Sequence, residues 1–209
     1  MSSVAFMHYT GIAPLVAGAL IVAGVVLVLK GKSGEKLLRY GLAVAVVGWL
    51  VYLVPFVTLD YSLREVFWNT SPGLPLWMRI ASSWASGGGS LYLFAVIVSA
   101  AGLYLLRVHK SRLFQVILGG IVLAALAAAF LNGAFSAMEE RPVSGAGLNP
   151  LLKSPWIYPH PLSTFGGYAL LSIGMVALLA GLRRRGLLVY ELGWALLTIG
   201  IVLGGYWSY

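Results

Sequence analysis

Long apolar runs constrain this chain more than any other feature of its sequence. A helix needs about 20 apolar residues to cross roughly 30 Å of hydrocarbon. Six runs reach that length, and they cover residues 10–29, 40–58, 89–106, 114–136, 162–182 and 189–208. Within lipid, a helix satisfies all of its backbone hydrogen bonds by itself. The runs therefore predict an all-α integral membrane bundle of about six transmembrane helices, forming one transmembrane domain over residues 1–209.

The composition points to the same class of protein. The chain is 60% hydrophobic and only 10% charged, whereas soluble domains are about 25% charged. Its net charge of +8 would suggest nucleic acid in a soluble protein, but here the basic residues lie in short loops between apolar runs. We therefore expect the lipid bilayer, and not nucleic acid, as the partner. The absence of cysteine excludes disulfides, thiolate metal sites and a CxxCH haem-attachment motif.

The basic residues also predict an orientation. Three short loops hold ten of the fourteen Lys and Arg residues: Lys30, Lys32, Lys36, Arg39, Arg107, Lys110, Arg112, Arg183, Arg184 and Arg185. The two longer connections, 59–88 and 137–161, mix basic with acidic residues. Positively charged loops stay in the cytoplasm. We therefore expect both termini and both long loops on the outer face of the cytoplasmic (plasma) membrane.

The two long loops hold the candidate binding residues. Trp84 belongs to an aromatic-rich stretch, which is typical of an interfacial belt but could also form a platform for a flat apolar ligand. His160 stands between Pro159 and Pro161, so its backbone is stiff. Its position alone favours a hydrogen-bonded surface histidine, with a metal or haem-iron ligand as the alternative. His8, in a terminus expected to be mobile, and His109, in a basic loop, are interpreted as surface histidines.

The spans themselves carry little polar chemistry. Pumps and proton-coupled transporters usually need an ionisable group inside the membrane. We find none deep in any run, and Glu191 lies at the cytoplasmic end of the last one. Gly200 and Gly204 recur at four-residue spacing, which favours close packing within the bundle, with a docking face for another subunit as the alternative.

Three segments, taken in chain order, resemble the N-terminal part of CcmF-type cytochrome c haem lyases. The first runs from Asp-Tyr-Ser at 60–62 to Trp-Ala-Ser-Gly-Gly-Gly-Ser-Leu at 84–91, similar to the family's W-G-x-H-E-G-S-L. The second is Leu-Asn-Pro-Leu-Leu at 148–152 followed by His-Pro at 160–161, similar to L-N-P-L-L and H-P-P. The third is 194–209, similar to the stretch that leads into the family's tryptophan-rich WWD haem-binding segment.

The resemblance implies a haem site at the outer face. In that family the matching histidine is an axial ligand of haem held by the WWD segment, so His160 is expected to bind the haem iron. Asn149, Pro161 and Trp84 are expected to shape the near wall. The implied cofactor is haem b, shared with a partner subunit, and no catalytic residue is identified. The sequence departs from the family at Gly87 and Gly88, where the family usually has His and Glu.

The resemblance also implies a function and partners. The sequence stops at Tyr209, where the WWD segment should begin, so we expect the N-terminal subunit of a split haem lyase that helps attach haem covalently to apocytochrome c. A separate WWD-bearing membrane subunit and a haem chaperone are the other expected partners. Two alternatives stay open. One is a structural or assembly subunit that binds no haem, and the other is a transporter subunit.

Overall fold

The computed structural model describes residues 6–208, and it is a helical bundle. The six long helices are α1 (Ile12–Leu29), α2 (Glu35–Thr58), α5 (Gly87–Leu106), α6 (Arg112–Leu131), α7 (Pro159–Leu179) and α8 (Arg183–Trp207). Each is long and apolar enough to cross a membrane. Within the described range there is no strand, only the isolated bridges Met7–Ser136 and Leu63–Ala137. The prediction of an all-α membrane bundle of six helices is confirmed.

The helix ends differ from the apolar runs by a few residues. α2 begins at Glu35 rather than at residue 40, because Glu35 pairs with Arg39 across its first turn at 2.9 Å. α6 ends at Leu131 rather than at residue 136, because Gly133 takes a left-handed φ of 78° and turns the chain. The length of an apolar run does not reveal a charged residue in the first turn of a helix or a glycine that ends the helix.

α7 begins at Pro159, three residues before the expected span, and this moves His160 from the loop into the first helical turn. Proline suits that turn because its fixed φ is helical and the first N–H groups of a helix have no intrahelical partner. The prolines on either side of His160 thus start the helix that carries it.

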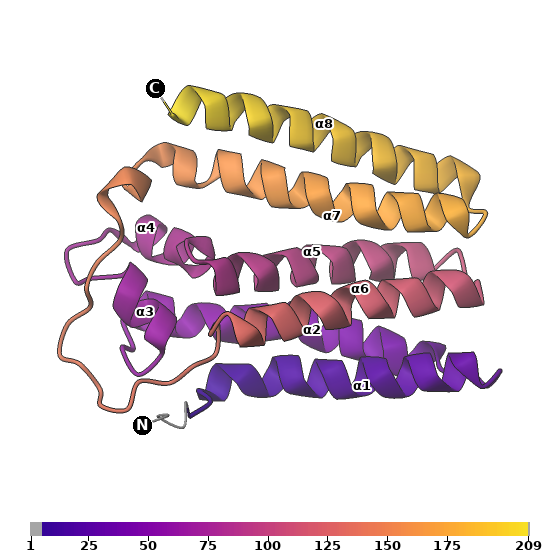
Figure 1. Ribbon diagram of the computed structural model, residues 1–209, viewed down its shortest axis with the longest axis horizontal. Helices are drawn as coiled ribbons and strands as arrows, with labels where there is room; N and C mark the ends of the chain where they lie inside the picture. The colour runs from indigo at the N-terminus through magenta and orange to yellow at the C-terminus, as the bar shows by residue number, and fades with distance from the viewer. Residues whose placement is uncertain (1–5, 209) are drawn as a thin grey trace.

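The two long connections contain short helices. The first holds α3 (Arg64–Asn69), α4 (Leu76–Ala81) and η2 (Ser82–Trp84), and the second holds η3 (Pro150–Leu152) and η4 (Pro155–Ile157). A further turn, η1 (Tyr9–Gly11), precedes α1. Figure 1 shows that α3, α4, the start of α1 and the end of α8 lie at the same end of the bundle. We call this the α3–α4 end, and the opposite one the basic end.

α5 lies at the centre of the bundle. It packs against α2, α6 and α7, while α1 packs against α2 and α6. The hairpin of α7 and α8 runs along one side, and α8 packs almost entirely against α7 (Figure 1). α8 is consequently the least buried of the six spans and α5 the most buried.

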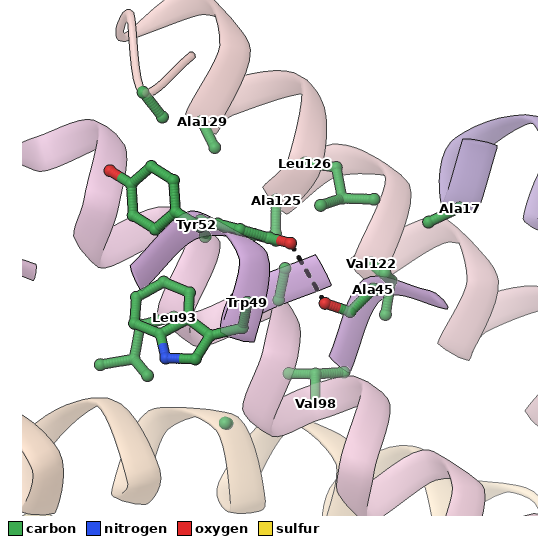
Figure 2. Packing of buried hydrophobic residues seen from close by; sticks show 14 of the residues in the cluster. Ala17, Ala45, Trp49, Tyr52, Leu93, Val98, Val122, Ala125, Leu126 and Ala129 are labelled. Atoms are coloured by element: carbon green, nitrogen blue, oxygen red, sulfur yellow. Dashed lines mark hydrogen bonds between the residues drawn. The ribbon is translucent and has the colours of Figure 1, made fainter. Parts of the chain in front are cut away.

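The core is built from small, branched aliphatic and aromatic side chains, and Figure 2 shows the part to which α1, α2, α5 and α6 contribute. Tyr52 of α2 and Tyr92 of α5 are fully buried and meet edge to face, with ring centroids 5.4 Å apart. Phe135, which follows α6, packs edge to face against both rings. The Tyr92 hydroxyl donates a hydrogen bond to the Ala45 carbonyl, 3.2 Å away. This cluster fixes the α3–α4 end relative to the spans.

Several basic residues of the short loops close helix ends. Arg112 donates to the carbonyls of Val28 and Leu29 at the end of α1, at 2.8–3.1 Å. His109 donates to the carbonyl of Ala180 just after α7, 3.0 Å away. The last carbonyls of a helix lack partners and carry partial negative charge, so donors there stabilise it. The residues that predict orientation therefore also terminate helices.

Candidate functional site

A cavity of about 250 Å³ opens at the α3–α4 end, between the entry to α5 and the α7–α8 hairpin. Its walls are mostly apolar and aromatic, with His160 and Thr164 as the polar side chains. The apolar lining comes from Trp84, Ala85, Leu152, Ile157, Pro161, Phe165 and Trp207. Three of the four residues expected at the site, His160, Pro161 and Trp84, are brought together here.

His160 has a defined tautomer. Its Nδ1 lies 2.8 Å from the backbone carbonyl oxygen of Gly200 on α8. A carbonyl can only accept a hydrogen bond, so Nδ1 carries the proton and donates it. Nε2 then keeps its lone pair, and within residues 6–208 it makes no hydrogen bond. An imidazole fixed by a carbonyl at one nitrogen and free at the other is arranged as a metal ligand.

The ring of His160 lies against the backbone of α8. A Cβ atom on Gly204 would come within 2.6 Å of His160 Cε1, so a side chain cannot be added there without moving the ring. The indole of Trp207 meets the imidazole edge to face, with centroids 5.7 Å apart. Gly200 and Gly204 thus pack inside the bundle, as the first interpretation of their spacing predicted, and they hold the histidine in place.

Trp84 forms the opposite wall. It is buried, and its indole N–H donates to the carbonyl of Ile157, 3.0 Å away. Its ring meets Tyr158 edge to face at 5.2 Å. The interfacial-belt interpretation is therefore wrong for Trp84, which instead joins the start of α5 to the segment before α7. Trp68 and Trp77 stay exposed, at 54% and 40%, as residues of such a belt would.

Asn149 lies outside the lining of the cavity. Its side chain is exposed and its Oδ1 accepts a hydrogen bond from the Leu151 N–H at 3.0 Å, which caps η3. That turn carries Leu152, which does line the cavity. The motif that pointed to Asn149 therefore identified the turn, while the contacting side chain is three positions later.

Of Gly87 and Gly88, which stand where the family usually has His and Glu, only Gly88 lies in a close contact, and the next residue, Gly89, lies in another. A Cβ on Gly88 would lie 2.9 Å from the Ala134 backbone nitrogen, and one on Gly89 would lie 2.0 Å from the Ser83 carbonyl oxygen. A Cβ on Gly87 would instead be in ordinary contact with Asn132. The start of α5 thus brings no polar side chain from these positions.

A second polar group at this end was missed by sequence reasoning. The expectation of a mobile His8 is wrong, since its ring is 5% exposed. Its Nε2 bonds to the Ser62 hydroxyl at 3.2 Å, and that hydroxyl donates to Asp60 at 2.7 Å. Burial lowers the pKa of His8 and the Asp60 charge partly offsets this. The network ties the N-terminal segment to the connection after α2, and it does not line the cavity.

The pKa values of Asp60 and Glu65 are shifted in opposite directions. Burial raises the pKa of Asp60, but hydrogen bonds from Ser62 and the charge of Arg141 outweigh it, so the pKa lies below its usual value. Glu65 is 7% exposed, and burial raises its pKa despite hydrogen bonds from Ser86 and Asn69. No group of three or more potential metal ligands occurs among residues 6–208, so His160 is a single candidate ligand rather than part of a cluster.

The size of the cavity limits what the chain can enclose. Pockets that bury a small organic ligand usually measure about 300–1,000 Å³, and this one measures about 250 Å³. The described residues therefore do not enclose a ligand of that size at this cavity.

Comparison with known proteins places the chain among proteins of cytochrome c maturation. A family model described as cytochrome C assembly protein matches residues 84–190. Cytochrome c-type biogenesis protein CcmF of Escherichia coli strain K12 is 30% identical over 198 residues, covering 85% of this chain and 30% of that protein. Protein ccl1 of Rhodobacter capsulatus is 31% identical over 204 residues, covering 86% and 31%. The chain thus spans about a third of the length of these relatives.

The fold has a match among solved structures. A structure titled cytochrome c heme lyase CcmF superposes with a TM-score of 0.75 and 21% sequence identity. The match covers 96% of this chain and 36% of that one. The six-helix arrangement is therefore one that also occurs inside a larger protein.

Proposed function

This chain belongs to the cytochrome c assembly protein family, with CcmF-type haem lyases among its relatives, and on that premise we propose that it supplies one wall and one axial ligand of a haem site. The haem held there is destined for covalent attachment to apocytochrome c. The observation that carries the proposal is the geometry of His160, with Nδ1–H donated to Gly200 and Nε2 free beside an aromatic cavity.

The residues present suit haem b. Porphyrin nitrogens already surround the iron, so a single imidazole from this chain is a sufficient contribution, and no cluster of protein ligands is needed. Trp84, Phe165 and Trp207 offer aromatic faces to a flat apolar ring, and no charged side chain lines the cavity. Pro161 stands in the first turn of the helix that carries the proposed ligand, and Asn149 fixes the turn that presents Leu152.

The rest of the site belongs to further polypeptide. The relatives are about three times longer than this chain, which supports additional membrane segments. In our proposal these include a WWD-bearing membrane subunit, whose residues would complete the haem site. A haem chaperone delivers the cofactor, and apocytochrome c approaches from the same side.

The α3–α4 end faces the outside of the plasma membrane in this proposal. The support is the charge distribution, since the Arg-rich short loops lie at the opposite end and such loops stay in the cytoplasm. When bound, haem supplies vinyl groups to which the cysteine thiols of apocytochrome c add. The chain's own task is to bind and orient: Gly200 keeps the proton on Nδ1, and the ring packing on Gly204 fixes the direction of Nε2.

The test uses the full assembly purified gently from native membranes. We expect His160→Ala to lower haem content and cytochrome c maturation together. His109→Ala is the matched control, because His109 also bonds to a backbone carbonyl but lies at the basic end. In His160→Gly, added imidazole should restore the low-spin haem spectrum. Unchanged haem content and spectrum in His160→Ala would show that the ligand assignment is wrong.

A structural or assembly subunit that binds no haem is the second candidate. The observation that favours it is the small cavity, which encloses no ligand by itself. In that case a WWD-type subunit is absent from the purified assembly, and His160→Ala changes neither haem content nor spectrum. Mass spectrometry of the co-purifying chains separates the two functions.

A further inference from the structure

The two faces of α8 differ in what covers them. Gly186, Val189, Gly193 and Gly200 are buried against α7. The opposite face is exposed along its whole length, and a spacing of three and four residues places its members in one stripe. The stripe consists of Glu191, Ala195, Thr198, Val202 and Gly205. We call it the free face of α8.

Glu191 makes the free face unlike a lipid-facing surface. It lies eight residues after Arg183, the first residue of α8, which is about 12 Å along the axis at 1.5 Å per residue. The helix has 25 residues and is therefore about 37 Å long, so only a few ångströms at each end extend beyond roughly 30 Å of hydrocarbon. Glu191 thus lies close to the basic-end edge of the hydrocarbon layer and not deep within it, where an uncompensated carboxylate that faces lipid is still costly.

No cation within the chain neutralises this carboxylate. Among residues 6–208 the ion pairs involve Glu35 and Asp60, and none involves Glu191. Arg184 and Arg185 border the same hollow of about 520 Å³, yet Arg185 is placed over the ring of Tyr104 instead, 5.9 Å from its centroid. The group that neutralises the Glu191 carboxylate must therefore come from outside the chain.

We propose that the free face of α8 is the docking surface of a further membrane-spanning helix, which presents a Lys or Arg side chain to Glu191. Two features support this occupant. Ala195 and Gly205 are small, so another helix backbone can approach closely, and Thr198 offers a hydroxyl for a hydrogen bond. The solved structure with the same fold is also much longer than this chain, which occupies 36% of it.

The same features argue against other occupants. Two copies of α8 related by an axis along the membrane normal would place both Glu191 carboxylates at the same depth and facing each other, and like charges in contact are unfavourable. Acyl chains offer no hydrogen-bond donor at all. The proposal does not depend on haem binding, because the free face points away from the face that contacts His160.

The test is site-specific photocrosslinking in intact native membranes. A photoreactive residue at Thr198 should crosslink to a polypeptide, and sequencing of the crosslinked peptide should identify a membrane-spanning segment with a Lys or Arg near its inner end. The control position is Val47, which is 59% exposed on α2 and should crosslink to lipid. Glu191→Lys should lower the crosslink yield at Thr198 roughly tenfold, and Glu191→Gln should lower it less.

Charge reversal completes the test. Changing the partner's basic residue to Glu in the Glu191→Lys background should restore the yield. Glu191→Lys should unfold at the same temperature as the unmodified chain in detergent, since the residue is exposed. Crosslinking of Thr198 to lipid alone, crosslinking to a second copy of this chain, or an unchanged yield in a folded Glu191→Lys variant would each overturn the proposal.

Discussion

The Nδ1–H of His160 donates a hydrogen bond to the carbonyl oxygen of Gly200, 2.8 Å away and 40 residues further along the chain. The acceptor belongs to α8, although the histidine stands in the first turn of α7. A backbone carbonyl inside a helix cannot rotate, so it fixes the tautomer and the ring direction together. The proposed ligand is thus positioned by the packing of two helices.

Gly204→Ala should disturb this arrangement without removing any ligand. The added Cβ would lie 2.6 Å from His160 Cε1, so the ring must shift away from Gly200. We expect an altered haem spectrum and weaker haem binding in the purified assembly. Gly120→Ala on α6 is the control, since nothing lies within 4 Å of its Cβ and it lies outside both the cavity and the free face of α8. Equal spectra for the two variants would contradict the positioning role of α8.

Gly89→Ala should destabilise the bundle. Its Cβ would lie 2.0 Å from the Ser83 carbonyl oxygen, which belongs to the backbone and cannot yield as a flexible side chain does. Overpacking of this kind costs about 1–3 kcal/mol or more, and thermal unfolding in detergent measures it. Gly120→Ala has open space around its Cβ and should be neutral or stabilising by up to about 1 kcal/mol. A Gly89→Ala variant as stable as Gly120→Ala would refute the close approach.

Trp84→Phe should loosen the wall of the cavity. The change removes the indole N–H that binds the Ile157 carbonyl at 3.0 Å and leaves a buried acceptor without a partner, which costs about 1–3 kcal/mol. Trp68→Phe is the control, because that indole is 54% exposed and makes no such bond. The unfolding temperature should fall for Trp84→Phe only, and a fall of equal size in both would show that the hydrogen bond is unimportant.

The stability of the chain should decline as the pH falls below about 6.5 because of His8. Burial holds the pKa of His8 below its ordinary value of 6.5 in the folded state. As the pH drops through 6.5, His8 is protonated in the unfolded chain before it is protonated in the folded one. Each further drop in pH therefore favours unfolding, until the pH passes the lower pKa of His8 in the folded state. Unfolding temperatures at pH 7.5 and 5.5 should differ less in His8→Gln than in the unmodified chain. An identical pH response would exclude His8 as its source.

Some features were accessible from sequence because local chemistry dictates them. A span needs about 20 apolar residues, so the six helices could be located to within a few residues from 60% hydrophobic composition and its spacing. The prolines beside His160 and the Asn-Pro turn marked the segment that carries the candidate site. Resemblance to a known family pointed to haem, and matching residues identified His160, Pro161 and Trp84, which meet at one cavity.

The tertiary structure decided which contacts these residues make. Asn149 caps a turn instead of lining the cavity, because its Oδ1 is taken by the Leu151 N–H. His8 is buried because its segment pairs with Ser136 and its ring reaches Ser62, 54 residues away. Sequence by itself determined where the membrane helices are, since the bilayer acts on each one separately. Only packing between helices fixed the tautomer of His160 and left Glu191 exposed, since both depend on which face of α8 meets α7.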